Sequence, residues 1–213
     1  ANLQTIAQIE ACDFVDTVYL TREEEGLLPL GKASVSLRKR MVEENSLPSD
    51  PPPPASIEQL DQLNLLPLHQ AGYRGKGIRI GVADGGFYNA NTMSALPKAQ
   101  WLGYADFTDD EDDFFGSTGN HGTLCVGAIL ASQSDYEGAA VEAEYFLFRT
   151  EEQYTESPKE LDNWVAAIEM ADSLGLHIVS TSLGYTTFDD EQFDFNYADM
   201  DGRISRGAQA AAI

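Results

Sequence analysis

The chain has 213 residues, of which 43% are hydrophobic and 10% aromatic, enough to bury one substantial core. Its 35 acidic residues against 13 basic ones give a formal net charge of −22, which disfavours nucleic acids and anionic membrane surfaces as partners. No apolar stretch is long enough to span a membrane, and the N-terminus lacks the basic start and apolar core of a signal peptide.

The N-terminal quarter of the chain is expected to form a small unit and a linker. Residues 3–15 carry apolar side chains close to helical spacing, and residues 16–21 alternate like a half-buried strand. A helix and a strand of this size are not stable alone. Prolines at 48 and 51–54 make a stiff spacer. We therefore predict three parts, which are residues 1–25, a proline-rich linker over 26–56, and a main domain over 57–213.

After the spacer, short apolar strands alternate with helices. The pattern predicts helical turns at 57–69, a glycine-rich turn at 72–77, strands at 78–83, 143–149 and 178–183, and helices at 121–132, 157–175 and from 204 onward. The helix over 157–175 has the clearest signals: Ser157 and Glu160 suit its first turn, and Trp164, Ile168 and Leu174 form an apolar stripe. Strands and helices in this alternation indicate βαβ units and a parallel sheet, hence an α/β fold.

Two polar residues stand where such sheets carry their chemistry. Asp84 follows the first strand, and His121 opens the next helix. A serine hydroxyl needs a base, histidine has a suitable pKa of about 6.5, and a carboxylate fixes the tautomer of that histidine. Gly85 lets the chain turn, and Gly122 would allow a close approach to substrate. Taken singly, an Asp before Gly is usually a turn residue, and a His beside Gly is usually a loop or capping residue. The hypothesis of a catalytic site therefore depends on the two residues together, each at the expected end of its own element.

Three segments then resemble the motifs of the subtilisin-like serine proteases, the subtilases. Residues 75–87 resemble the aspartate motif, 121–127 the histidine motif and 180–184 the substrate-binding strand. The resemblance extends over residues 57–213 and keeps the chain order of the family. It implies a subtilisin-like doubly wound fold, with a mostly parallel sheet and helices on both faces, incomplete at the C-terminus.

The resemblance also implies roles for single residues. Asp84 would orient His121, which would act as general base and later as general acid. Ser182, Leu183 and Gly184 would pair with the backbone of a polypeptide substrate. Residues 1–25 are similar to the end of a subtilase propeptide, and an extracellular or periplasmic enzyme is implied. Gly85 replaces the Ser or Thr that is common in the family.

The nucleophile of the family is missing from these 213 residues. Neither the serine motif Gly-Thr-Ser-Met-Ala nor the strand with the oxyanion-hole asparagine is found. We therefore expect the N-terminal part of a serine endopeptidase that is inactive alone and has the C-terminal remainder of its domain as a partner. One alternative is a non-catalytic, subtilase-like peptide-binding module. A doubly wound small-molecule enzyme is disfavoured, because no Gly-x-Gly-x-x-Gly turn follows the first strand.

Other polar features carry weaker hypotheses. The acidic run at 109–113 could hold calcium, but it lacks the alternation of a defined calcium loop, so a solvated surface is favoured. No cofactor and no metal site are assigned. Cys12 and Cys125 fit neither a metal cluster nor a disulfide framework and are expected to be buried free thiols. His69 and His177 are expected to be structural.

Overall fold

The structure is a computed structural model that describes residues 54–108, 113–116 and 119–199. The chain divides into two compact units, residues 1–40 and 41–213, and every described residue belongs to the second unit. The elements predicted at 3–21 and beyond 204, and most of the acidic run at 109–113, lie outside the described residues.

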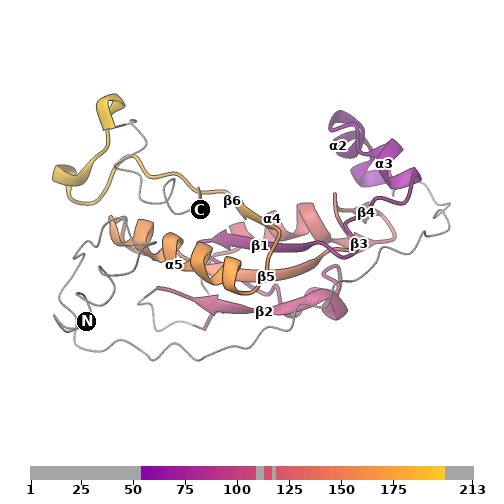
Figure 1. Ribbon diagram of the computed structural model, residues 1–213, viewed down its shortest axis with the longest axis horizontal. Coiled ribbons are helices and arrows are strands. Elements are labelled where there is room, and N and C mark those ends of the chain that lie inside the picture. The colour runs from indigo at the N-terminus through magenta and orange to yellow at the C-terminus, as the bar shows by residue number, and fades with distance from the viewer. Residues whose placement is uncertain (1–53, 109–112, 117–118, 200–213) are drawn as a thin grey trace, which may run out of the picture. The chain divides into compact units, whose positions relative to one another are not determined.

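A sheet of four parallel strands forms the centre of the described unit. Its order is β2 (Trp101–Asp106), β5 (Glu144–Arg149), β1 (Arg79–Asp84) and β6 (Ile178–Thr181). Figure 1 shows these strands side by side. The two middle strands, β1 and β5, are buried almost throughout, which is why they are continuous apolar runs. The predicted α/β class with a parallel sheet is confirmed.

Two helices cover the two faces of this sheet, because alternate strand residues point to opposite faces. One core joins α4 (His121–Leu130) to one face through Ile80, Val82, Tyr145 and Leu147. The other core joins α5 (Lys159–Ser173) to the opposite face through Ala83, Phe146 and Phe148. The predicted helices on both faces are therefore present.

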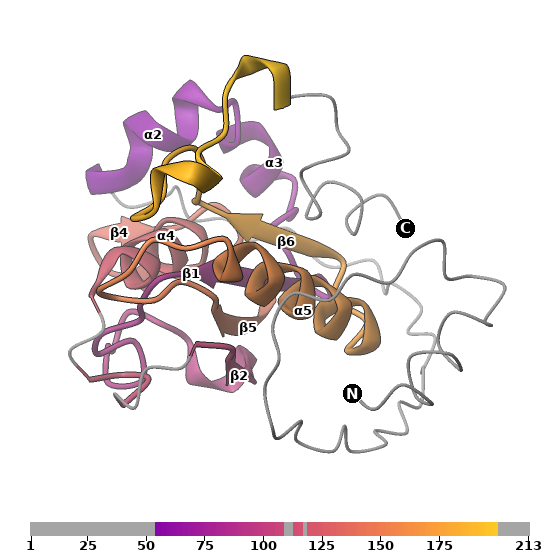
Figure 2. The same cartoon turned by 90° about the vertical axis from the view of Figure 1, so that its left-hand side faces the viewer.

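The segment before β1 packs beside a small hairpin, as Figures 1 and 2 show. It contains η1 (Pro54–Ser56), α2 (Ile57–Gln62) and α3 (Leu66–Gln70), and the hairpin contains β3 (Ser132–Gln133) and β4 (Tyr136–Glu137). The Glu137 backbone N–H donates to the Ser56 hydroxyl over 2.9 Å and joins the two parts. The remaining elements are short 3₁₀ turns, η2 (Lys98–Gln100), η3 (Glu191–Phe193) and η4 (Tyr197–Asp199).

The structure departs from the sequence-based expectations in three places. Strands β2, β3 and β4 were not predicted, and β6 lies at the edge of the described sheet, with Ile178 exposed, rather than in its interior. On α5 the fully buried apolar positions are Leu161, Ala167 and Ala171, while the predicted stripe of Trp164, Ile168 and Leu174 is only half-buried. Within the described residues, no helix combines the length and apolar character needed to cross a bilayer.

Candidate active site

Asp84 and His121 meet at the carboxyl end of β1. The two Asp84 carboxylate oxygens lie 3.0 and 2.9 Å from His121 Nδ1, and one of them also accepts the Gly85 N–H over 2.9 Å. The Asp84 side chain is 1% exposed and the His121 side chain 63% exposed. The site therefore pairs a buried carboxylate with an imidazole that solvent and ligands can reach.

Gly122 explains why the helix can come so close to β1. A Cβ atom at this position would lie 2.6 Å from the Gly86 carbonyl oxygen, 2.7 Å from the Phe87 ring and 2.8 Å from the Asp84 Cβ. A side chain at residue 122 would thus push the start of α4 away from the strand end. The close approach expected at Gly122 is an approach to the protein's own backbone at Asp84 and Gly86.

The pair has the geometry to control where the imidazole carries its proton. With the carboxylate on Nδ1, that nitrogen carries the ring proton and donates it to Asp84, which we assign from the hydrogen-bond geometry. Nε2, on the opposite side of the ring, is then left with its lone pair. A neutral imidazole in this tautomer can accept a proton at Nε2, while the buried carboxylate stabilises the resulting imidazolium.

The predicted substrate-binding residues follow β6 directly and lie near this pair. Ser182 and Gly184 are exposed and Leu183 is half-buried, and none of the three lies in a regular helix or strand. The Ser182 hydroxyl accepts a hydrogen bond from the Cys125 thiol over 3.5 Å, and that sulfur lies 3.9 Å from both His121 ring nitrogens. The structure thus brings Ser182 to the candidate active site. The roles of these residues remain predictions.

Both ends of this segment are fixed by hydrogen bonds that the sequence did not reveal. The Trp164 indole N–H donates to the Thr181 hydroxyl over 2.9 Å, and the Tyr185 hydroxyl donates to Glu151 over 2.6 Å. Burial raises the pKa of Glu151, hydrogen bonds from Tyr185 and Thr150 oppose that rise, and repulsion from Asp84 adds to it. Burial and the Glu151 carboxylate raise the pKa of Tyr185. The only sequence signal for Glu151 was its place two residues beyond β5.

Cys125 differs from expectation, because it is half-buried rather than buried. Among the described residues, two groups of three side chains bring ligand atoms close enough to hold a metal ion. One group is Asp84, His121 and Cys125, and the other is Glu151, Glu156 and Glu160. Burial raises the pKa of Glu160 to about 8 against two backbone N–H donors, while Glu151 and Glu156 raise it further by repulsion.

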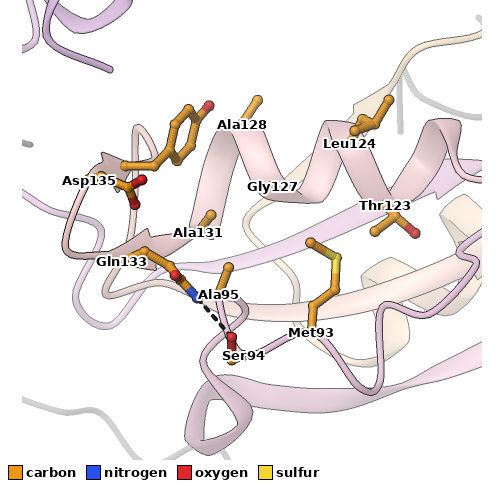
Figure 3. Close-up of a pocket in the computed structure, with 11 residues that line it drawn as sticks. Met93, Ser94, Ala95, Thr123, Leu124, Gly127, Ala128, Ala131, Gln133 and Asp135 are labelled. Carbon is orange, nitrogen blue, oxygen red and sulfur yellow. Dashed lines mark hydrogen bonds between the residues drawn. The ribbon is translucent and has the colours of Figure 1, made fainter. Parts of the chain in front are cut away.

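A cavity of about 540 Å³ lies beside α4 and is shown in Figure 3. Its wall is mostly apolar and includes Met93, Leu124 and Tyr136, and the side-chain amide of Gln133 donates to the Ser94 hydroxyl across one edge over 2.8 Å. None of the predicted site residues lines it. The cavity is therefore separate from the carboxylate–imidazole pair, although Thr123 and Leu124 follow His121 in the same helix.

These features define a parallel α/β protein with a carboxylate-oriented imidazole at a strand end, the arrangement used to activate a hydroxyl nucleophile. The family model described as "Subtilase family" matches residues 75–212, well over half of the chain. The chain belongs to the subtilase family, and its general class is that of serine peptidases. A comparison with curated proteins finds no match.

Several solved structures are similar to this chain. The chain is 20% identical to MycP1 with the N-terminal propeptide removed, covering 56% of this chain and 36% of that one, with a TM-score of 0.42. The chain is also 20% identical to MycP1 from the ESX-1 type VII secretion system. The match covers 65% of this chain and 38% of that one, with a TM-score of 0.44. It is 19% identical to a chain of the periplasmic assembly from the ESX-5 inner membrane complex. That match covers 66% of this chain and 42% of the other, with a TM-score of 0.48. The chain thus spans about two fifths of the length of these structures.

Proposed function

We propose that this chain supplies the acid and the base of a serine endopeptidase. Asp84 holds the imidazole, and His121 serves as general base and then as general acid. The observation that carries the proposal is the contact of the buried Asp84 carboxylate with Nδ1 of an exposed histidine, at 2.9 and 3.0 Å. Membership of the subtilase family over residues 75–212 supports it.

In the proposed reaction, His121 Nε2 takes the proton of a serine hydroxyl while the serine oxygen attacks the carbonyl carbon of the scissile peptide bond. The same proton then passes to the leaving amine, the peptide bond breaks, and an acyl-enzyme remains. Water attacks the acyl group with His121 again as base. Asp84 stabilises the imidazolium, and the attraction between the two groups is strengthened because the buried carboxylate lies in a low local dielectric.

We further propose that a polypeptide substrate lies along Ser182, Leu183 and Gly184 in extended form. Strand addition needs a backbone that is accessible and held in place. Ser182 and Gly184 are exposed, and the segment is held at its ends by the hydrogen bonds of Thr181 and Tyr185. The reaction as proposed needs no cofactor, and calcium has no part in it.

The nucleophile in this proposal comes from a longer polypeptide. The 213 residues contain no Gly-Thr-Ser-Met-Ala sequence. We therefore propose that these residues alone do not hydrolyse peptides, and that the serine and the oxyanion-hole asparagine come from the remainder of the same domain. The family resemblance further leads us to place the working enzyme in the periplasm or outside the cell.

A fluorophosphonate probe tests the proposal, since it reacts only with an activated serine. We expect the polypeptide that includes the serine segment to be labelled and the 213-residue chain to remain unlabelled under the same conditions. Labelling of the 213-residue chain would show that its own residues contain the nucleophile. If the longer form folds, binds peptides and is not labelled, the chain is a peptide-binding module instead.

A further inference from the structure

The thiol of Cys125 stands beside the carboxylate–imidazole pair. Cys125 follows His121 by four residues in α4, so the two side chains share one face of the helix. The sulfur lies 3.9 Å from each ring nitrogen of His121 and 3.5 Å from the Ser182 hydroxyl. A thiol this close to an imidazole and a carboxylate adds a third kind of metal ligand to the site.

The donor set determines which cations would fit. The ligand atoms of Asp84, His121 and Cys125 all lie within 4.8 Å of one another, and they offer one oxygen, one nitrogen and one sulfur. Zn²⁺ and similar borderline cations bind such mixed sets, whereas Ca²⁺ and Mg²⁺ require oxygen ligands. The other group of three, Glu151, Glu156 and Glu160, offers oxygen alone and lacks this selectivity.

Two of the three separations between ligand atoms can be compared with those of a tetrahedral zinc site. Zinc bonds of about 2.0–2.3 Å place neighbouring ligand atoms roughly 3.3–3.6 Å apart. The nitrogen–sulfur separation of 3.9 Å is slightly longer than this range, and the oxygen–nitrogen separation of 2.9 Å is slightly shorter. Asp84 is fixed by burial, while the exposed His121 ring has room to turn and adjust both distances. Three protein ligands would leave the fourth position of the metal to water.

We propose that Asp84, His121 and Cys125 bind one Zn²⁺ ion, and that this binding switches the peptidase site off. The Cys125 thiol loses its proton to solvent as the sulfur–zinc bond forms. Zinc takes the place of the single ring proton on Nδ1, and that proton moves to Nε2. The nitrogen that would accept the proton of the nucleophile is then occupied, and Asp84 no longer holds the imidazole. The net charge of −22 attracts the cation.

Zinc binding rests on the geometry alone, while inhibition also rests on the proposed function, and the two can be measured separately. Co²⁺ replaces Zn²⁺ in such sites and gives a thiolate-to-cobalt charge-transfer absorption in the near ultraviolet. We expect the 213-residue chain to develop this absorption with one equivalent of Co²⁺ and to lose it when Zn²⁺ is added. This measurement requires no serine nucleophile.

Two cysteine variants form a matched pair for this experiment, because Cys12 and Cys125 are the only cysteines. We expect Cys125→Ser to abolish the absorption and to weaken Zn²⁺ binding more than about 100-fold, beyond the loss that second-shell partners cause. Cys12→Ser should retain both. Asp84→Asn should keep the absorption and weaken Zn²⁺ binding at least about 10-fold. Thermal unfolding of each variant checks that it is folded, and Cys125→Ala replaces the serine variant if that one unfolds.

The proposal is overturned if the wild-type chain gives no charge-transfer absorption, or if the absorption survives Cys125→Ser and disappears with Cys12→Ser. Zinc binding that is lost only in Glu151→Gln would assign the ion to the carboxylate group instead. If the absorption forms as expected but the longer polypeptide shows no peptidase activity, the zinc site stands and the proposed function fails.

Discussion

The described part of the chain contains two histidine–carboxylate pairs that differ in how far the imidazole is exposed to solvent. In the pair of His121 and Asp84, the nitrogen–oxygen distance is 2.9 Å, and the acid is 1% exposed while the imidazole is 63% exposed. In the pair of His69 and Glu137 the distance is 3.7 Å, and both side chains are buried, at 2% and 8% exposure. The second carboxylate is also paired with Arg74.

The difference shows what separates a candidate catalytic pair from a structural one. His69 Nε2 is hydrogen-bonded to the Ala139 carbonyl oxygen over 2.9 Å, so its ring is enclosed by protein and joins α3 to the hairpin region. His121 is hydrogen-bonded at Nδ1 to its carboxylate, has the Cys125 sulfur 3.9 Å from its ring nitrogens, and keeps a largely exposed side chain. Both pairs have a carboxylate, so the carboxylate alone does not identify the site. The exposed imidazole with a buried acid does.

The largest expected contrast between the pairs is in catalysis. In the longer polypeptide with its serine segment, Asp84→Asn should lower kcat about 10⁴-fold, the loss that this change causes in another serine protease triad, because the imidazole adopts the wrong tautomer. Glu137→Gln should leave kcat within a few-fold, since its histidine is enclosed. Peptide hydrolysis at saturating substrate measures both. Near-wild-type activity of the Asp84→Asn enzyme would remove Asp84 from the mechanism.

The pair of His69 and Glu137, with its partner Arg74, should instead contribute mainly to the free energy of unfolding. Arg74→Met leaves the Glu137 carboxylate buried without its main cation, and removal of one partner of a buried ion pair costs about 3–5 kcal/mol. The matched control is Arg79→Met, because Arg79 pairs with Glu144 at 3.2 Å but both side chains are more than one third exposed. An exposed pair is worth about 0–1 kcal/mol. Urea unfolding of both variants measures the difference, and equal losses would contradict it.

The sequence alone was enough to predict the helices and strands whose apolar residues form a clear pattern. Strands β1 and β5 and helices α4 and α5 all appear close to where their apolar patterns place them. Strand β2 was missed because Gly103 interrupts Trp101–Asp106 and its apolar residues do not alternate with polar ones, although no position of the strand is buried. Its place in the sheet depends on pairing with β5, a long-range contact that no local pattern encodes.

The same limit applies to the site. Asp84 and His121 could be predicted because each stands at the end of its own element, and their contact is present in the structure. Glu151 and Tyr185 could not, because neither residue belongs to a motif that the sequence offers, and only the fold brings their two segments together. Cys125 was interpreted as a core residue, since its position in the helix did not reveal that the exposed His121 ring would lie beside it.

A third prediction concerns how α4 brings His121 to Asp84. Gly122→Ala would place its Cβ 2.6 Å from the Gly86 carbonyl oxygen, and an overpacked position of this kind costs about 1–3 kcal/mol. Gly127→Ala in the same helix is the control, because a Cβ there meets no atom within 4 Å. Alanine in place of glycine should stabilise that helix by about 0.5–1 kcal/mol. Opposite shifts in the unfolding midpoint are expected, and a stabilising Gly122→Ala would contradict the close packing.

The last prediction concerns Glu160, a buried carboxyl group with no histidine beside it. Two backbone N–H groups, of Glu152 and Ser157, donate to its side chain over 2.8 and 3.3 Å and hold the loop before α5. Burial raises its pKa from 4.5 to about 8. Between these two pH values the folded chain retains a proton that the unfolded chain has lost. The free energy of unfolding should therefore fall as the pH rises through this window, by at most about 1.4 kcal/mol per pH unit.

Glu160→Gln should remove this part of the pH dependence, because an amide does not titrate. Glu169→Gln provides the control, since Glu169 lies on the same helix but is exposed. Urea unfolding at pH 5, 6.5 and 8, roughly the window set by the two pKa values, measures the slope for all three chains. A slope unchanged by Glu160→Gln would mean that another group takes up the proton, and Glu151, whose pKa burial also raises, would then be the next to replace. The buried carboxylate of Asp84 is hydrogen-bonded to an imidazole, whereas Glu160 has none beside it, so the slope measures what a buried carboxylate costs without such a partner.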